Sequence, residues 1–177
     1  TFTNKAAREM RDRIMNVVGP SASRGLWMGT FHSIFSRILR AEAEMIGFTP
    51  QFTIYDTADS KALVKSIIKE MGLDDKTYKS SAVQSRISNA KNHLVMPAAY
   101  NANSANYADD KRHNTPDFGK IYETYCRRCR EANAMDFDDL LVYTAFLFKQ
   151  RSDVLARYQE RFQYILVDEY QDTNTVQ

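Results

Sequence analysis

The fold class of this chain is decided by one stretch, Tyr164-Ile165-Leu166-Val167-Asp168-Glu169-Tyr170-Gln171-Asp172. In it, four largely apolar residues lead directly into two adjacent carboxylates. An apolar run of this length with polar residues on both sides predicts a buried strand of a parallel sheet. Ligands of open parallel sheets bind beyond the carboxyl ends of the strands, and Asp168 and Glu169 would stand at that position.

Asp168 and Glu169 are residue types that suit nucleotide hydrolysis. One carboxylate can hold Mg²⁺, directly or through water, and the next can position an attacking water molecule. This is the Walker B arrangement of a nucleotide hydrolase. The alternative is a strand that ends in a solvated acidic turn, and a bare apolar-Asp-Glu sequence does not decide between the two. The extended string from Asp168 to Asn174 favours the hydrolase.

Composition places the chain among ordinary globular proteins. Its 177 residues suffice for one large domain or two small ones, and 44% hydrophobic with 26% charged residues is normal. The net charge is only +2, but residues 1–40 contain seven Lys and Arg residues against two carboxylates. Such a local excess suits a polyanion, although basic helix faces also serve solubility.

The cysteines and the apolar runs exclude several classes of protein. Cys126 and Cys129 form a lone Cys-Arg-Arg-Cys without a second pair to complete a zinc site, so we expect core thiols. Low cysteine use fits a reducing cytoplasm, and no apolar stretch approaches the roughly 18 residues that would predict a membrane span. The chain begins without Met and in the middle of a motif, as a piece of a longer protein would.

Hydrophobic periodicity predicts strands only near the two ends of the chain. The expected strands cover residues 1–3, 26–30 and 164–167. Apolar positions at helical spacing predict helices that end at Gly19-Pro20 and at Gly47, and a further helix that Asp136 caps.

The middle of the chain is predicted to be helical. The expected helices cover residues 57–71, 81–94 and 118–131. Residues 97–116 are rich in Asn and Ala with little periodicity, and we expect a long surface loop there. A parallel-sheet domain with a helical domain inserted between its halves accounts for this order of elements.

Residues 1–7 form a strand-to-helix junction that could bind nucleic acid. Backbone N–H groups at a helix start, together with Thr3, Asn4 and Lys5, can hold a phosphate. Phe2 could offer a stacking face for a base. On this segment alone, a capped helix with a core Phe is the favoured interpretation.

Residues 29–33 form a second predicted strand-to-helix junction, which could bind a phosphate in the same way. Thr30, His32 and Ser33 can donate to phosphate oxygens, and Gly29 permits close approach of the backbone. A lone His at such a position is more often a surface or capping residue than a catalyst.

Residues 134–140 contain three carboxylates, Asp136, Asp138 and Asp139. Grouped carboxylates can bind a metal or act as acid and base. At a helix start, however, Asp136 as the cap and Asp139 in the first turn would satisfy free N–H groups and the helix dipole. Taken alone, this segment favours capping.

Four strings occur in order along the chain: TFTNKAAREM at 1–10, GTFHS at 29–33, AMDFDDLL at 134–141 and ILVDEYQDTN at 165–174. Together they resemble motifs Ia, Ib, Id and II of superfamily 1 DNA helicases of the UvrD/PcrA/Rep type. Ordered matches to four motifs are far more specific than a match to any one of them. The similarity includes residues 88–92 of the helical block and is weakest in the Asn- and Ala-rich loop.

The resemblance implies an α/β fold in which an all-helical insertion interrupts a truncated RecA-like parallel-sheet domain. Residues 1–52 would be the first part of the ATPase domain, without a phosphate-binding loop. Residues 53–133 would be the helical insertion. Residues 134–177 would be the second part, which ends in the Walker B motif.

The resemblance also implies ATP- and Mg²⁺-dependent 3′-to-5′ translocation on single-stranded DNA and unwinding at duplex junctions. Asp168 would hold Mg²⁺, Glu169 would position and deprotonate the attacking water, and Gln171 would couple the nucleotide and DNA sites. The residues implied to line the DNA track are Phe2, Thr3, Asn4, Lys5, Thr30, Phe31, His32 and Ser33. Little sequence specificity is expected, because phosphates and base faces carry no strong sequence code.

Two parts that such a motor needs do not occur in these 177 residues: the Gly-x-x-x-x-Gly-Lys-Ser/Thr loop and the arginines of a second RecA-like domain. We therefore expect the fragment itself to be inactive and to self-associate through an exposed sheet edge. The full-length protein is expected to be a cytoplasmic ATPase, monomeric or weakly dimeric.

Two other interpretations remain open. A helicase–nuclease related to RecB or AddA shares these motifs, and its nuclease domain would lie beyond Gln177. A non-catalytic nucleic-acid-binding or regulatory domain could keep the same fold. A phosphate-binding loop immediately upstream in the full-length gene would support the motor over the binder.

Overall fold

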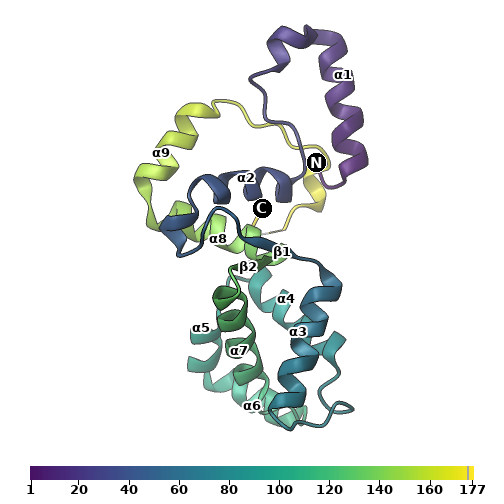
Figure 1. Cartoon of the computed structure of the whole chain (residues 1–177), viewed down its shortest axis with the longest axis vertical. Helices are drawn as coiled ribbons and strands as arrows, with labels where there is room; N and C mark the ends of the chain where they lie inside the picture. Colours follow the sequence, from purple (N-terminus) through teal and green to yellow (C-terminus); the bar gives the residue numbers. More distant parts are fainter. Residues whose placement is uncertain (175) are drawn as a thin grey trace. The chain divides into compact units, whose positions relative to one another are not determined.

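The computed structural model describes residues 1–174, 176 and 177 (Figure 1). Contacts divide this part of the chain into two units. Unit 1 combines Thr1–Pro50 with residues 143–174 and 177, and unit 2 comprises Gln51–Val142 with residue 176. The chain is rich in helix and contains a small parallel sheet, in agreement with an α/β class. None of the helices in the described residues is both long and apolar enough to cross a membrane.

Unit 2 contains the sheet and a block of helices. Strand β1 (Thr53–Tyr55) pairs in parallel with β2 (Ala134–Asp136), with Ile54 opposite Met135. Parallel strands need a long crossover, and the helical block between them supplies it. Its helices are α3 (Thr57–Glu70), α4 (Ser80–Asn92), α5 (Pro97–Ala102), α6 (Ser104–Arg112) and α7 (Phe118–Glu131), and the unit also includes the first residues of α8 (Phe137–Gln150).

Capping residues mark both ends of α3 in unit 2. At α3, the Asp56 carboxylate accepts from Asp59 N at 2.8 Å, and the Asp59 carboxylate accepts from Asp56 N at 3.1 Å. This reciprocal capping box satisfies two N–H groups that a helix start leaves free. Gly72 follows α3 with a φ of 67°, a left-handed conformation that glycine adopts without steric cost. The helices predicted over 57–71, 81–94 and 118–131 are confirmed as α3, α4 and α7.

The hydrophobic core of unit 2 lies among α3, α4 and α7. Its fully or nearly fully buried members include Val64, Ile67, Val83, Ile87, Ile121, Tyr122, Tyr125 and Cys129. Cys126 packs against this cluster, and burial raises the pKa of the Cys129 thiol to about 12. Both thiols are therefore neutral packing groups, as predicted.

The prediction of a long loop over 97–116 is wrong, because α5 and α6 occupy most of it. Both helices are short and polar, so they lack the apolar periodicity that would have predicted them. Pro97 takes the first position of α5, and the Asn103 side chain caps α6 by accepting from Ala105 N at 3.0 Å. Asp110 of α6 is buried and pairs with Arg86 of α4, which fixes α6 to the block.

Unit 1 is made of helices and irregular segments. Its elements are α1 (Asn4–Ser23), α2 (Phe31–Ala41), the 3₁₀ helix η1 (Ala43–Ile46), the remainder of α8, α9 (Ser152–Arg161) and the 3₁₀ helix η2 (Tyr170–Asp172). Buried Glu42 accepts from Arg157 Nη2 at 3.0 Å and from Tyr158 Oη at 3.3 Å, which ties the end of α2 to α9. Gly47 ends the helical stretch of α2 and η1 with a φ of 77°, as predicted. The predicted helix end at Gly19-Pro20 is wrong, because α1 continues to Ser23 beyond a break at Gly19.

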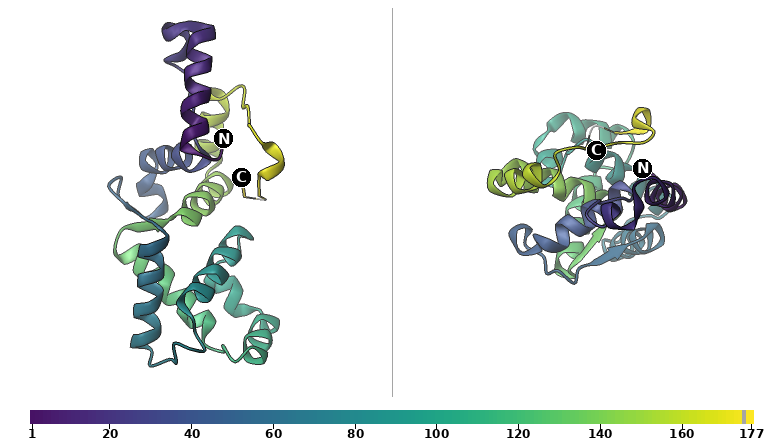
Figure 2. Two further views of the ribbon diagram at one scale, coloured as in Figure 1. Left: turned by 90° about the vertical axis from the view of Figure 1, so that its right-hand side faces the viewer. Right: turned by 90° about the horizontal axis from the view of Figure 1, so that it is seen from above.

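The three strands predicted near the ends of the chain are not formed. Residues 1–3, 26–30 and 164–167 carry no strand, and Figure 2 draws the segment after α9 as an irregular coil. Tyr164, Ile165 and Leu166 are 90%, 77% and 94% exposed instead of buried. A strand exists only when a neighbour supplies its hydrogen bonds, and within the described residues only β1 and β2 pair. The two observed strands thus lie directly before and after the helical block, not near the ends of the chain.

Candidate functional site

The adjacent carboxylates of the acidic motif lie in an exposed turn before η2. Asp168 Oδ2 accepts a hydrogen bond from Thr1 Oγ1 at 3.4 Å, so the turn lies beside the start of the chain. Glu169 has φ 56° and ψ 46°, an uncommon left-handed conformation for a residue with a side chain. Gln171 Nε2 donates to the Glu169 carboxylate. The turn therefore exposes the carboxylates of Asp168 and Glu169 to solvent, and the Gln171 amide is hydrogen-bonded to Glu169.

At each of the two predicted strand-to-helix junctions, a threonine caps the helix that follows. Thr3 Oγ1 accepts from Ala6 N at 3.1 Å at the start of α1, and Thr30 Oγ1 accepts from Ser33 N at 3.2 Å at the start of α2. The segments before both helices are extended rather than β-strands. The predicted helix starts are thus present at both junctions.

Both junctions contribute to one pocket of unit 1, with a volume of about 370 Å³. Two helix N-termini and two arginines beside one cavity suit an anion such as a phosphate. The lining residues are Asn4, Ala7, Arg8, Arg11, Gly29, Thr30 and Ser33.

The aromatic residues of the junctions pack on each other. The Phe2 and Phe31 rings lie 5.4 Å apart between centroids, and Phe31 and Phe35 lie 6.0 Å apart. Phe2 and Phe31 are half-buried, so each ring keeps part of its surface in solvent. Lys5 is exposed beside Glu9, with 4.0 Å between the charged atoms.

The acidic motif at residues 134–140 forms a buried cluster in unit 2. Lys91 Nζ is fully buried and lies 2.6 Å from Asp136 Oδ2 and 2.7 Å from Asp139 Oδ1. Tyr125 Oη donates to Asp136 Oδ2 at 2.8 Å. Asp136 and Asp139 also form a capping box at the start of α8, with N–H to carboxylate distances of 2.8 and 3.1 Å. The predicted cap is confirmed, and a lysine occupies the place that a metal or substrate would need.

Burial and charge set the protonation of this cluster. Burial raises the pKa of Asp139 to about 7, against the opposing charge of Lys91. Burial also disfavours the charged form of Asp136, but Lys91 outweighs it and lowers the pKa of that carboxyl. Asp139 and Asp136 together hold the pKa of Lys91 well above its usual value despite its burial. The approach of Lys91 to Asp139 is an ionic contact without hydrogen-bond alignment, since Asp139 Oδ1 accepts no hydrogen bond from the described residues.

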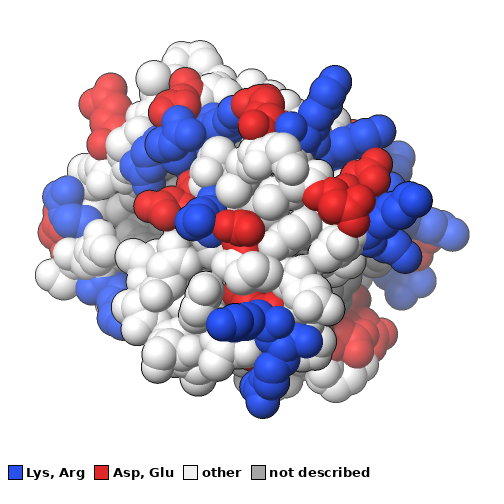
Figure 3. Space-filling view, turned by 90° about the horizontal axis from the view of Figure 1, so that it is seen from below, with Lys and Arg blue, Asp and Glu red and all other residues white. Residues whose placement is uncertain are grey.

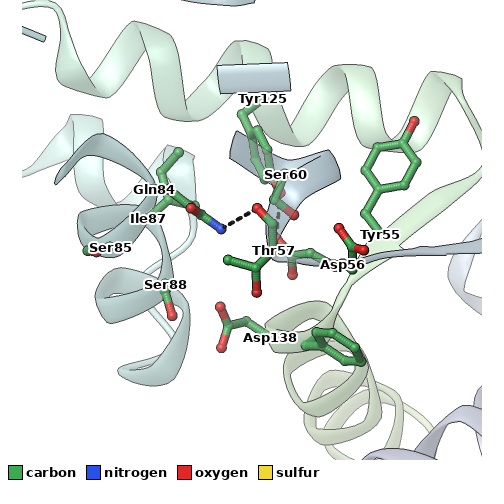
Figure 4. A pocket seen from close by; sticks show the side chains of 12 residues that line it. Tyr55, Asp56, Thr57, Ser60, Gln84, Ser85, Ile87, Ser88, Tyr125 and Asp138 are labelled. Carbon is green, nitrogen blue, oxygen red and sulfur yellow. Dashed lines mark hydrogen bonds between the residues drawn. The ribbon is translucent and has the colours of Figure 1, made fainter. Parts of the chain in front are cut away.

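Asp138, between the two buried carboxylates, faces a separate pocket of about 400 Å³ in unit 2 (Figure 4). Asn92 Nδ2 donates to Asp138 Oδ1 at 2.9 Å, and Gln84 Nε2 donates to Thr57 O at 3.3 Å across the pocket wall. Figure 4 shows the Thr57 and Ser88 hydroxyls facing the same space as Asp138. Among the described residues, the charged groups of this lining are all carboxylates, with no Lys or Arg, so it does not suit a phosphate.

Surface charge by itself does not locate a nucleic-acid interface. On the face drawn in Figure 3, Lys and Arg side chains lie interspersed with Asp and Glu. Surface cations of unit 2 are also paired, for example Lys120 with Asp117 at 3.0 Å and Arg112 with Asp109 at 2.9 Å.

Comparison with known proteins identifies the family. The UvrD/REP helicase N-terminal domain matches residues 1–177. The chain belongs to the UvrD/REP helicase family. It is 43% identical to the ATP-dependent DNA helicase PcrA of Leuconostoc citreum and 42% identical to that of Bacillus subtilis (strain 168), in each case over 177 residues. These alignments cover 100% of this chain and 23% of each relative. The family predicted from the four motifs is confirmed.

In this helicase-family chain, the structure brings the residues of motifs Ia and Ib together but assigns them no role. Asn4, Thr30 and Ser33 line one pocket, and Phe2 contacts Phe31. His32 is half-buried. The roles of Asp168, Glu169 and Gln171 remain predictions, because exposure and a hydrogen bond do not define a catalytic group.

Arg8 and Arg11 also line this pocket, although neither was predicted as a site residue. Arg8 Nε donates to Asn4 O at 3.3 Å, and Arg11 Nη2 donates to Met28 O at 3.0 Å. The signal was available, since positions 4, 8 and 11 repeat at the spacing of one helix face. Both arginines were counted in the excess of positive charge over residues 1–40, but that count does not say where they lie in the structure.

The acidic turn of this helicase-family chain fits Mg²⁺ by the chemistry of its donors. Mg²⁺ in phosphate-handling sites takes one or two carboxylates and completes its shell with waters and substrate oxygens. Exposed Asp168 can supply such a carboxylate, and Glu169 lies next to it. In the described residues no group of three or more His, Cys, Asp and Glu side chains gathers to hold a metal by itself.

Proposed function

We propose that the chain is the first part of an ATP-driven DNA helicase motor. The observation that carries this proposal is the family match over residues 1–177, which includes the acidic turn at residues 168–172. The chain spans 23% of the length of the relatives quoted above, so activity belongs to the full-length protein in this proposal. Those relatives are named ATP-dependent DNA helicases.

In this proposal the acidic turn handles the nucleotide. Asp168 would hold the Mg²⁺ that accompanies ATP, and that ion would supply charge for the phosphate oxygens. Glu169 would orient the attacking water and accept its proton, because its carboxylate is solvated and adjacent to Asp168. Gln171, which donates to Glu169, would link the nucleotide site to the DNA site.

The pocket at the two helix starts is proposed to hold the backbone of single-stranded DNA. Asn4, Thr30 and Ser33 would meet phosphate oxygens, and Arg8 and Arg11 add positive charge beside them. The other proposed DNA contacts from these motifs are Phe2, Thr3, Lys5, Phe31 and His32. Translocation would be 3′ to 5′, as the resemblance implies, with opening of the duplex at its junction.

A RecA-like sheet is part of the same proposal. Residues 164–167 have the composition of a buried parallel strand, yet Leu166 is 94% exposed. We propose that this run pairs with further strands in the full-length protein. As an isolated polypeptide, residues 1–177 would tend to self-associate through the exposed run and would not hydrolyse ATP, since they contain no phosphate-binding loop.

DNA-stimulated ATP hydrolysis tests this proposal. The full-length protein and the 177-residue polypeptide would be assayed side by side, with and without single-stranded DNA. We expect turnover that DNA stimulates in the first and none in the second. DNA binding without turnover in the full-length protein would contradict the motor and favour a non-catalytic binding protein.

A further inference from the structure

A second pocket of unit 1 lies outside the proposed nucleotide site and shares Arg11 and Ser33 with the pocket proposed for DNA. It has a volume of about 540 Å³ and is formed by α1, the segment after it and α2. We call it the arginine-lined pocket. Its lining includes Arg11, Arg24 and Arg37, with apolar surface from Met15, Leu26 and Met28.

A break in α1 shapes one wall of this pocket. Gly19 interrupts the helix with φ 81° and ψ 164°, a conformation that few residues other than glycine adopt. The chain then makes one more turn, in which Ser23 Oγ donates to Pro20 O at 3.2 Å. Pro20 and Ser23 both line the pocket, so the turn after the break is part of its wall.

The charge of the arginine-lined pocket has one sign. Among the described residues its lining includes three arginines and no carboxylate. Arg11 Nη2 donates to the carbonyl of Met28 at 3.0 Å, and the Arg37 guanidinium lies 3.9 Å from the centre of the Trp27 ring. These contacts orient the two guanidinium groups without neutralising their charge. The pocket therefore attracts carboxylates or phosphates.

The uncharged part of the lining favours a protein over DNA. Tracks for single-stranded DNA offer aromatic faces on which bases stack, whereas the apolar lining here is aliphatic. The nearby Trp27 ring is covered, because Arg37 and Arg161 lie 3.9 and 4.8 Å from its centre. Met15 and Leu26 are 37% and 49% exposed beside the arginines. Met and Arg together are enriched at protein–protein interfaces.

We propose that the arginine-lined pocket docks an acidic segment of a partner protein that carries bulky apolar side chains. Carboxylates of that segment pair with Arg24 and Arg37, and an apolar side chain packs on Met15 and Leu26. Charge complementarity selects the partner, and burial of the aliphatic lining adds affinity. This role goes beyond translocation on DNA, since it connects the proposed motor to another protein.

A designed peptide tests the proposal in the full-length protein. The probe is a short fluorescein-labelled peptide in which Asp and Glu alternate with Leu and Phe, and its binding is followed by fluorescence anisotropy. We expect Arg24→Glu and Leu26→Asp each to weaken binding at least about tenfold, as truncated interface anchors do. Arg24→Lys keeps the charge and should retain most of the binding.

Matched controls lie on α1 outside the pocket. Arg13→Glu and Val17→Asp make the same chemical changes at exposed positions and should alter binding less than about twofold. Equal losses in these controls, or no binding to the wild-type protein, would overturn the proposal. Circular dichroism of each variant verifies that it is folded.

Competition with single-stranded oligo(dT) shows whether the pocket binds the acidic peptide or DNA. If oligo(dT) displaces the peptide and its own binding falls in Arg24→Glu, the pocket belongs to the DNA track and the proposal is overturned. If oligo(dT) leaves the peptide bound, the protein partner is supported. DNA-stimulated ATP hydrolysis is read separately, so a failure of the motor proposal does not count against the docking pocket.

Discussion

Two acidic motifs of this chain have similar composition and opposite environments. Asp168 and Glu169 of unit 1 lie in a solvated turn, where the described hydrogen bonds come from Thr1 and Gln171. Asp136 and Asp139 of unit 2 are buried against Lys91. The two carboxylate pairs thus differ in environment: Asp168 and Glu169 are exposed to solvent, whereas Asp136 and Asp139 have a buried counter-ion.

The difference between the two motifs shows that spacing alone does not assign a carboxylate its chemistry. Asp136 and Asp139 stand three residues apart, which is the spacing of a capping box. The positive charge of Lys91 on α4 pairs with these two carboxylates, so they cap the helix and are not free to bind a metal. Asp168 and Glu169 are consecutive, so they cannot form such a box with each other, and they follow an apolar run. The predictions below test whether the two motifs are as different in function as in environment.

The largest effect is expected from Glu169→Gln in the full-length protein. Removal of a general base costs about 10²–10⁴ in rate, so DNA-stimulated ATP turnover should fall at least a hundredfold. Binding of ATP should stay nearly intact, because Asp168 keeps the carboxylate proposed for Mg²⁺. Turnover and nucleotide affinity would be measured in parallel. Glu160→Gln, an exposed position on α9, serves as the control, and loss of ATP binding in Glu169→Gln would reject its role as base.

Lys91→Met should have the largest effect on stability. It leaves two buried carboxylates without their cation, and breaking a buried ion pair in this way costs about 3–5 kcal/mol. Hydrogen exchange of the α4 and α7 amides in the full-length protein would measure the loss as a fall in local opening free energy.

Lys65→Met on the exposed face of α3 is the matched control for Lys91→Met, and it should change that free energy by less than about 0.5 kcal/mol. The double variant Lys91→Met with Asp139→Asn should recover part of the loss, because one of the uncompensated charges is removed. Equal protection in Lys91→Met and the wild-type protein would show that the cluster does not stabilise unit 2.

Helix boundaries were predictable where a side chain near the helix marks its end. Asp56 and Asp136 cap α3 and α8, and Gly47 and Gly72 take left-handed conformations after their helices. Strands were not predictable in the same way, since a strand depends on a partner that can be distant in sequence, as β1 and β2 are. The run 164–167 has the right composition and no partner among the described residues, whereas β1 and β2 are only three residues each.

Part of each acidic site was predictable, and part was not. The cap at Asp136 follows from local spacing, but its pairing with Lys91 joins residues 45 positions apart. A signal for Lys91 did exist, because positions 83, 87 and 91 share the buried face of α4. A lysine on such a face needs a buried counter-ion, and the sequence does not say which carboxylate supplies it.

Between pH 5 and pH 7, the pH dependence of the buried cluster should be smaller than the effect of Lys91→Met. Burial raises the pKa of Asp139 from 3.8 to about 7. Between these values the folded protein binds one more proton than the unfolded chain. The Asp139 contribution to stability is therefore lost as pH rises from 4 to 7, by at most about 1.4 kcal/mol per pH unit. Asp136, whose pKa is lowered, acts in the opposite direction and only below its usual range.

Asp139→Asn should remove this pH dependence, because the amide does not titrate and its oxygen can still accept from Asp136 N. Hydrogen exchange of α4 and α7 at pH 5 and pH 7, corrected for the intrinsic rate at each pH, gives the opening free energies. Asp138→Asn is the control, since Asp138 lies in the same motif but is only half-buried. An unchanged slope in Asp139→Asn would assign the pH dependence to another group.

The smallest effect on stability is expected from Asp168→Asn in the exposed turn. Its described partner is the Thr1 hydroxyl at 3.4 Å, and an exposed hydrogen bond of that length contributes little to stability. The free energy of unfolding should change by less than about 0.5 kcal/mol, while ATP turnover should fall sharply if Asp168 holds Mg²⁺. Thermal unfolding without nucleotide and hydrolysis with Mg²⁺ would be measured on the same preparation. A large loss of stability with turnover retained would reverse the comparison, because the exposed turn would then be the structural motif.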